Sequence, residues 1–290
     1  MVYRIENRPR PLAAAITVAV AGLLLAGCDG EAAAPSAASP GACGVPSATP
    51  APARDGVRIT AVGPGCAQYE VTNPDTEPAD VAVLFTQFSP SGGAIGNLPR
   101  TVTAVPAGAT VRGQVELDRS TPDRTHLKVV KVRRVPTAEA PAPGGPCPAS
   151  GVRVYADDEP DAAMGLRAVG LHLRNCGTAT VNVNGYPQLQ LLDADHRQVD
   201  GIDVLRGGAA IATGTGADTP PAPIALHPGE GAVATLVWRN TTTDGTPVNA
   251  PYVRVRAFAG AAPVMVTPEL DLGTTGRLGA GAWVREAAQP

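Results

Sequence analysis

Glycine and proline recur so densely along this chain that long helices are excluded. The sequence contains 33 glycines and 30 prolines among 290 residues, together more than a fifth of the chain. Glycine weakens a helix interior, and proline removes a helical hydrogen bond and kinks the helix. No run of a dozen residues keeps a helical period with caps, whereas turn sequences such as Asn184-Gly185 and Pro228-Gly229 separate short apolar runs. We therefore expect strands joined by turns.

Alternation of apolar and other side chains supports this expectation, because a period of two places alternate side chains on a core face and a solvent face. In the segment 126–135 (HLKVVKVRRV) the phase slips at Val129-Val130, which predicts a β-bulge or a strand covered on both faces. The clearest alternating sets are Val81, Val83 and Phe85; Val169, Leu171 and Leu173; and Val253, Val255 and Ala257.

The N-terminus has the pattern of an export signal. Arg4, Arg8 and Arg10 precede an unbroken small and apolar run, Leu12–Ala26. The run is too short to span a bilayer, which needs about 20 residues as a helix.

The leader ends in Leu25-Ala26-Gly27-Cys28, which resembles the lipobox of bacterial lipoproteins. In that motif cleavage falls before the cysteine, whose sulfur carries a diacylglycerol. The alternative is an ordinary signal peptide followed by a cysteine. The resemblance predicts lipidation at Cys28 and a protein that this anchor holds at the extracytoplasmic face of the cell membrane, and a diacyl group anchors firmly where a single chain does not.

The cysteine count agrees with this prediction. The chain has five cysteines, and an odd number in an exported protein would leave a free thiol. Lipidation of Cys28 leaves four cysteines, for which three connectivities are possible. We expect the two local disulfides, Cys43 with Cys66 and Cys147 with Cys176, because each pair then falls within one module. Each should stabilise the fold by roughly 3 kcal/mol if the chain-entropy model holds.

Low-complexity segments divide the chain. The predicted parts are a signal peptide (1–27), a lipidated and flexible Ala/Pro/Ser tether (28–54), a first module (55–136), a linker (137–146) and a second module (147–290). Both modules have the length of a single domain. Short strands with such turn spacing predict an all-β protein with two immunoglobulin-like antiparallel β-sandwiches. The modules also share a strand ending in Asn73 or Asn175 and a later turn with proline and glycine, Pro106-Ala107-Gly108 or Pro228-Gly229, which suggests that they are related.

The charge limits the partners. The net charge of −3 becomes −5 once the leader, with three arginines and one glutamate, is removed. Nucleic acid calls for clustered Lys and Arg, so we expect no nucleic-acid partner. We expect the membrane, contacted through the lipid on Cys28, and an envelope protein or cell-wall component as partners.

The second module resembles a bacterial family known as domain of unknown function 4232, found in envelope lipoproteins of high-GC Gram-positive bacteria. The resemblance covers most of 147–284 and lies in Leu171–Gly177 (LHLRNCG), Asn184-Gly185-Tyr186-Pro187 with the following 188–193 (QLQLLD), and Ile224–Trp238 (IALHPGEGAVATLVW). It implies a β-sandwich envelope module and brings no activity, cofactor or site residue.

Residue chemistry gives no enzyme motif. No GxSxG or Ser-x-x-Lys sequence is present, and the histidines are scattered, so we expect no catalytic, cofactor or metal site. The four carboxylates in 193–203 could suggest calcium, but they lack the EF-hand pattern and are equally explained by a solvated hairpin turn. We therefore predict a non-enzymatic binding or accessory module. The alternative is a surface hydrolase whose site would bring together loop residues such as Asp193, His196 and His227.

Overall fold

A computed structural model describes Cys43 and residues 52–63, 65–118 and 126–287. Apart from one short 3-10 turn, η1 (Thr137–Glu139), the regular structure of these residues is β-strand, so the expected all-β fold is confirmed. No helix in the described ranges is long and apolar enough to cross a bilayer. The predicted signal peptide, Cys28 and most of the tether lie outside the described residues.

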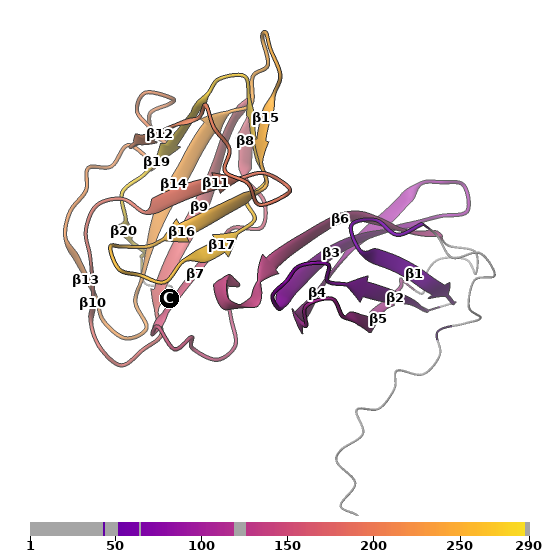
Figure 1. Ribbon diagram of the computed structural model, residues 1–290. Helices are drawn as coiled ribbons and strands as arrows, with labels where there is room; N and C mark the ends of the chain where they lie inside the picture. Colours follow the sequence, from indigo (N-terminus) through magenta and orange to yellow (C-terminus); the bar gives the residue numbers. More distant parts are fainter. Residues whose placement is uncertain (1–42, 44–51, 64, 119–125, 288–290) are drawn as a thin grey trace, which may run out of the picture. The chain divides into compact units, whose positions relative to one another are not determined.

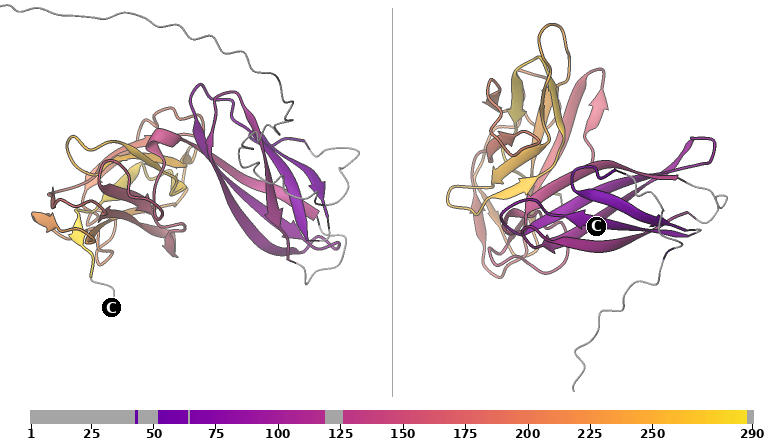
Figure 2. Two further views of the ribbon diagram at one scale, coloured as in Figure 1. Left: turned by 90° about the horizontal axis from the view of Figure 1, so that it is seen from below. Right: turned by 45° about the vertical axis from the view of Figure 1, so that its right-hand side comes forward.

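The first module is a sandwich of two antiparallel three-stranded sheets, with strand orders β1-β2-β5 and β4-β3-β6. Figures 1 and 2 show its long strands running alongside one another. Its described strands are β1 (Val57–Val62), β2 (Cys66–Thr72), β3 (Ala79–Phe88), β4 (Ala94–Val105), β5 (Thr110–Glu116) and β6 (His126–Pro136).

Side chains from both sheets form the core of the first module. The alternating Val81, Val83 and Phe85 of β3 are buried in it, and the Phe85 ring lies 4.9 Å from the ring of Tyr69 on β2. The bulge predicted in β6 is present, because the pairing with β3 skips Val130 and leaves this side chain 40% exposed.

The second module has a larger sheet, in the order β12-β19-β14-β9-β7 with β20 on β14 and β8 on β9, and a sheet β11-β16-β17. Two further strand pairs are β10-β13 and β15-β18. Its described strands are β7 (Val152–Ala156), β8 (Asp161–Ala163), β9 (Leu166–Asn175), β10 (Val181–Val183), β11 (Gln188–Leu192), β12 (Asp203–Arg206), β13 (Ile224–Leu226), β14 (Gly231–Arg239), β15 (Val248–Ala250), β16 (Tyr252–Arg256), β17 (Val264–Val266), β18 (Leu270–Gly273), β19 (Arg277–Ala280) and β20 (Val284–Arg285).

One strand pair corrects the expectation of antiparallel pairing throughout. β12 and β19 pair in parallel, with Asp203 opposite Arg277. Parallel neighbours need a long connection, and the chain supplies one, because the six strands β13 to β18 lie between β12 and β19 in the sequence. The other pairs between the described strands are antiparallel.

The core of the second module contains the alternating residues of β9 and β16, together with Trp238 and Trp283. A small third cluster joins Val135 of β6 to Leu192, Tyr252 and Met265. Residues from Gly41 to Pro290 thus form one compact unit with two main cores. The division into two immunoglobulin-like domains stays a prediction.

Both modules contain the same arrangement around a buried asparagine at a strand end. In the first module the Asn73 side chain donates to the carbonyls of Glu77 and Val105, both at 2.9 Å, and accepts from the Asp75 N–H at 3.0 Å. The Asn73 carbonyl accepts from the N–H of Gly108, in the Pro-x-Gly turn.

Asn175 repeats these contacts in the second module. Its side chain donates to Ala179 and Leu226, both at 2.8 Å, and accepts from Gly177 at 3.0 Å. Its carbonyl accepts from the N–H of Gly229. The partners lie at matching offsets from the asparagine and from the turn glycine, Gly108 or Gly229, which supports the suggestion that the modules are related.

Candidate functional site

The most concentrated group of titratable side chains surrounds His172 on β9. The alternation of β9 buries Leu171 and Leu173 in the core and turns His172 to the opposite face of the sheet. There its Nε2 lies 2.8 Å from Oδ1 of Asp157, and its Nδ1 lies 2.6 Å from Oε1 of Glu286. We name Asp157, His172 and Glu286 the histidine cluster.

The backbone fixes both carboxylates. Asp157 follows β7 and exchanges hydrogen bonds with Gly170: its N–H donates to the Gly170 carbonyl at 3.0 Å, and its Oδ2 accepts from the Gly170 N–H at 2.8 Å. Glu286 follows β20, and its N–H donates to the carbonyl of Gly231 on β14 at 3.0 Å.

Two glycines make room for these carboxylates. A Cβ at Gly170 would overlap the carboxylate of Asp157, and a Cβ at Gly231 would overlap that of Glu286. Neither glycine has a positive φ, so a side chain at either position would conflict with the place of a carboxylate rather than with the backbone conformation.

The electrostatic environment favours protonated His172. Burial alone would lower the pKa of this imidazole, but hydrogen bonds to Glu286 and Asp157 and the charges of both carboxylates outweigh it, so the pKa is raised above its usual value. The ring of Tyr155 on β7 stacks on the imidazole at 4.8 Å between centroids and 12° between planes. Burial, followed by the charge of Glu286, raises the pKa of Tyr155 as well.

A groove of about 470 Å³ adjoins this cluster, with Tyr155 and Asp157 in its wall. It is lined by apolar side chains of β3 and β4, including Leu84 and Pro99, and by charges of both signs. One of these charges is Arg133, which holds Glu269 through two hydrogen bonds of 2.7 and 2.6 Å. The lining of the groove therefore combines apolar side chains with paired charges.

A second hollow, of about 620 Å³, lies at the turn that carries the family resemblance. It is lined by Asn184–Pro187, by the start of β11, and by Val204, Leu205 and Arg206 of β12. β12 is the outer strand of its sheet in the described topology, and Val204 is 42% exposed. A loop turn and a strand edge together form a surface of the kind that binding modules use.

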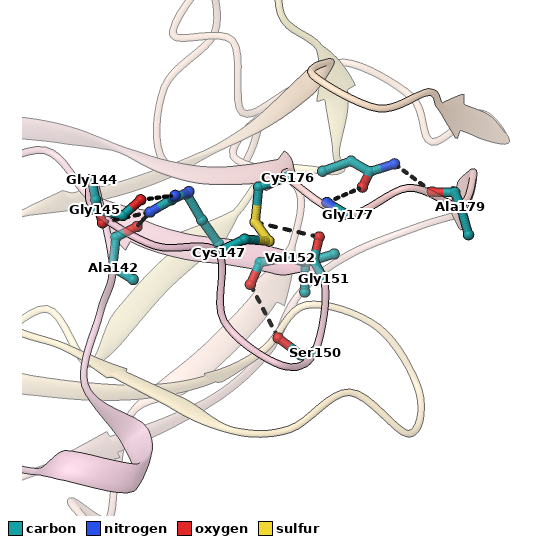
Figure 3. The surroundings of a disulfide bond; sticks show 12 residues. Ala142, Gly144, Gly145, Cys147, Ser150, Gly151, Val152, Cys176, Gly177 and Ala179 are labelled. Carbon is teal, nitrogen blue, oxygen red and sulfur yellow. Dashed lines mark hydrogen bonds between the residues drawn. A yellow bond between two sulfur atoms is a disulfide. The ribbon is translucent and has the colours of Figure 1, made fainter.

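The two disulfides are Cys43–Cys66 and Cys147–Cys176, the local pairing expected from the sequence. Figure 3 shows the second of them beside Gly151, where the chain enters β7. The preceding segment is also held there, because Arg153 donates to the carbonyls of Ala142, Gly144 and Gly145.

The residues named for a hydrolase site fall in two places: Asp193 and His196 share one turn, in which the His196 N–H donates to the Asp193 carbonyl at 3.1 Å, and His227 lies elsewhere. Asp193 caps its own turn by accepting from the N–H groups of Asp195 and Arg197. His196 packs edge-on against Tyr252, whereas His227 lies 3.3 Å from the hydroxyl of Thr180. The structure does not unite these three residues in one contact network.

The first part of the acidic segment 193–203 forms a hairpin turn, because the Asp193 N–H donates to the Arg197 carbonyl at 2.8 Å and Leu192 pairs with Gln198, whereas Asp203 lies in β12. Besides the cap made by Asp193, its Asp195 pairs with Arg197 at 2.7 Å. Among the described residues, no group of three or more His, Cys, Asp or Glu side chains has an arrangement that could hold a metal ion.

The histidine cluster was not predicted from the sequence. The alternation of β9 places His172 on an outward face, but Asp157 is 15 residues away and Glu286 is 114 residues away. Gly170 and Gly231 indicate the positions of the two carboxylates only once the strand pairing is known.

These observations define a class: a disulfide-bonded, all-β sandwich protein whose second module carries the histidine cluster and a hollow at the turn Asn184–Pro187. Residues 147–286 match the family model described as Domain of unknown function (DUF4232), so the second module belongs to that family. A search of curated proteins finds no match to the chain.

Proposed function

We propose that this chain is a lipid-anchored extracytoplasmic envelope protein that serves as a non-enzymatic binding or accessory module. The observation that carries the proposal is the cysteine inventory. Four of the five cysteines are joined in two disulfides, and the remaining one, Cys28, ends the lipobox-like Leu25-Ala26-Gly27-Cys28. Disulfides persist in oxidising compartments such as the extracytoplasmic space, which agrees with export.

The surfaces of the second module support binding rather than a reaction. Within the described part of the chain, the side chains that contact His172 are two carboxylates and a tyrosine ring, none of which is a serine, threonine or cysteine nucleophile. The hollow at Asn184–Pro187, in contrast, combines a turn with a strand edge. We propose this hollow as the binding surface, with an envelope protein or a cell-wall component as partner.

Metabolic labelling tests the anchor. Cells expressing the full chain are fed an alkyne analogue of palmitate, and the purified protein is analysed by mass spectrometry of its N-terminal peptide. We expect a chain that begins at an acylated Cys28 and is found in the membrane fraction. Cys28→Ala should lose both the label and the membrane association, whereas Cys147→Ala, as the matched cysteine control, should keep the label. An intact, unacylated leader on the mature protein would refute the proposed anchor.

Binding is tested by cross-linking in intact cells, with a photoreactive residue placed at Val204 or, as an exposed control away from the hollow, at Met164, which is 98% exposed. We expect cross-links to a defined envelope component from position 204 and not from position 164. Equal labelling from both positions would contradict a binding surface at the hollow.

A further inference from the structure

We propose that the histidine cluster is a proton-dependent clasp that fastens the C-terminal strand β20 to the larger sheet, closed while His172 is an imidazolium and opened when its ring becomes neutral. The clasp goes beyond the proposed binding function, because it concerns how one strand of the sheet is held.

The geometry itself requires the proton. Both ring nitrogens of His172 face a carboxylate oxygen, at 2.8 and 2.6 Å. An ionised carboxylate only accepts hydrogen bonds, and an imidazole donates from both nitrogens only in its protonated form. In the neutral ring one lone pair would point at a carboxylate oxygen, so one of the two contacts becomes repulsive.

The surroundings are built for this contact. Gly170 and Gly231 leave the space that the two carboxylates occupy against the sheet, and Tyr155 covers one face of the ring. His172 is also only partly accessible, with 20% of its side chain exposed, so water screens the cluster less than it would an exposed ion pair.

The strand that the clasp holds has few other attachments. β20 contains two residues, which pair with Ala232 and Val233 of β14. Beyond this pairing, Arg285 contacts Glu230 at 2.5 Å and the carbonyl of Ala225 at 2.6 Å, and the Glu286 N–H donates to the Gly231 carbonyl at 3.0 Å. The buried Trp283 directly precedes the strand. A short strand held by few contacts opens at a low free energy, so the loss of one contact has a measurable effect.

The residues paired directly with His172 in the sheet carry no charge, so we expect the clasp to respond mainly to the protonation of His172 itself. Opposite His172, β14 and β20 contribute the uncharged Val233 and Val284. The titratable or charged side chains on the remaining neighbouring segments are Arg153 and Tyr155 of β7, Arg174 of β9, and Asp158 and Glu159 after Asp157.

The test joins two measurements on the full-length protein in detergent micelles. NMR titration of the histidine rings gives the pKa of His172, assigned by the loss of its signals in His172→Gln. Hydrogen exchange, corrected for intrinsic rates, gives the protection of the Glu286 N–H, which donates to Gly231 in the closed form. We expect protection to fall as the pH rises through the measured pKa of His172. The linkage between protonation and opening sets the size of this fall. The protection of the Glu286 N–H should drop about tenfold for each unit by which the pKa of His172 exceeds that of a free imidazole.

Variants separate the clasp from general instability. Glu286→Gln replaces the carboxylate with an amide that can pair with a neutral ring, so the pH dependence should largely vanish while the strand stays paired. His227→Gln, the matched control, alters an exposed histidine outside the cluster and should leave the dependence unchanged. The proposal is overturned if His172 in the unmodified protein titrates at or below the free imidazole value. It is equally overturned if the protection of Glu286 stays constant across the titration.

Discussion

Replacing Asn175 with alanine should destabilise the second module by about 3 kcal/mol. The side chain is fully buried and makes three hydrogen bonds, two as donor and one as acceptor. The carbonyl of Leu226, a fully buried residue, would lose its amide partner at a cost of about 2 kcal/mol. Ala179 is exposed and Gly177 partly exposed, so water can replace those two contacts at about 0.5 kcal/mol each.

Urea unfolding followed by tryptophan fluorescence measures this change. Both tryptophans, Trp238 and Trp283, are buried in the second module, so their emission reports its unfolding. A loss of 3 kcal/mol should also lower Tm by about 12 °C, since roughly 4 °C corresponds to each kcal/mol in a domain of this size. Asn175→Asp should be similarly destabilised, because it keeps the acceptor but turns a second oxygen toward two carbonyls.

Asn182→Ala is the matched control, since Asn182 lies on nearby β10 with its side chain exposed. This change should stay within about 0.5 kcal/mol of the unmodified protein. The reasoning is refuted if Asn175→Ala costs no more than Asn182→Ala while both variants keep the denaturant slope of the unmodified protein.

Three further changes test other parts of the fold. Asn73→Ala should destabilise the first module comparably, and it should leave the fluorescence midpoint unmoved if the modules unfold as separate domains, with circular dichroism reporting the first transition. Gly113→Ala would push a Cβ into the ring of Tyr69 and should cost about 1–3 kcal/mol by urea unfolding, whereas Gly96→Ala, with open space around it, should cost less than about 1 kcal/mol. Removing the Cys147–Cys176 disulfide by double alanine substitution should lower stability by about 3 kcal/mol, measured beside the unmodified protein under oxidising conditions.

Local patterns in the sequence predicted much of the fold. Alternation identified β3, β9 and β16, because each has one face in a core and its period of two is visible without knowing its partner. The double valine at 129–130 pointed to the bulge in β6 through the same alternation, because one extra residue in a strand reverses the order of inward and outward side chains after it. The disulfide pairing followed from locality, since the two bonds join cysteines only 23 and 29 residues apart in the sequence.

Features that depend on distant partners were not predictable in this way. The parallel pairing of β12 with β19 joins Asp203 to Arg277, and nothing in the four residues of β12 records the direction of its neighbour. The burial of Trp283 depends on the carbonyl of Ala257, which accepts from its indole N–H at 2.8 Å. The histidine cluster likewise combines segments after β7 and β20 with the middle of β9.

The paired asparagines show which constraints the two modules share and which they do not. In the first module β3 and β4 lie between Asn73 and its Pro-x-Gly turn, whereas β10, β11, β12 and β13 lie between Asn175 and the equivalent turn. The hydrogen bonds at the two ends of this interval are nevertheless the same. A buried amide that satisfies two backbone carbonyls fixes the local geometry where strands meet, and it leaves the length of the chain between those points free. The family match covers 147–286 alone, yet the buried asparagine and the hydrogen bonds around it recur in the first module.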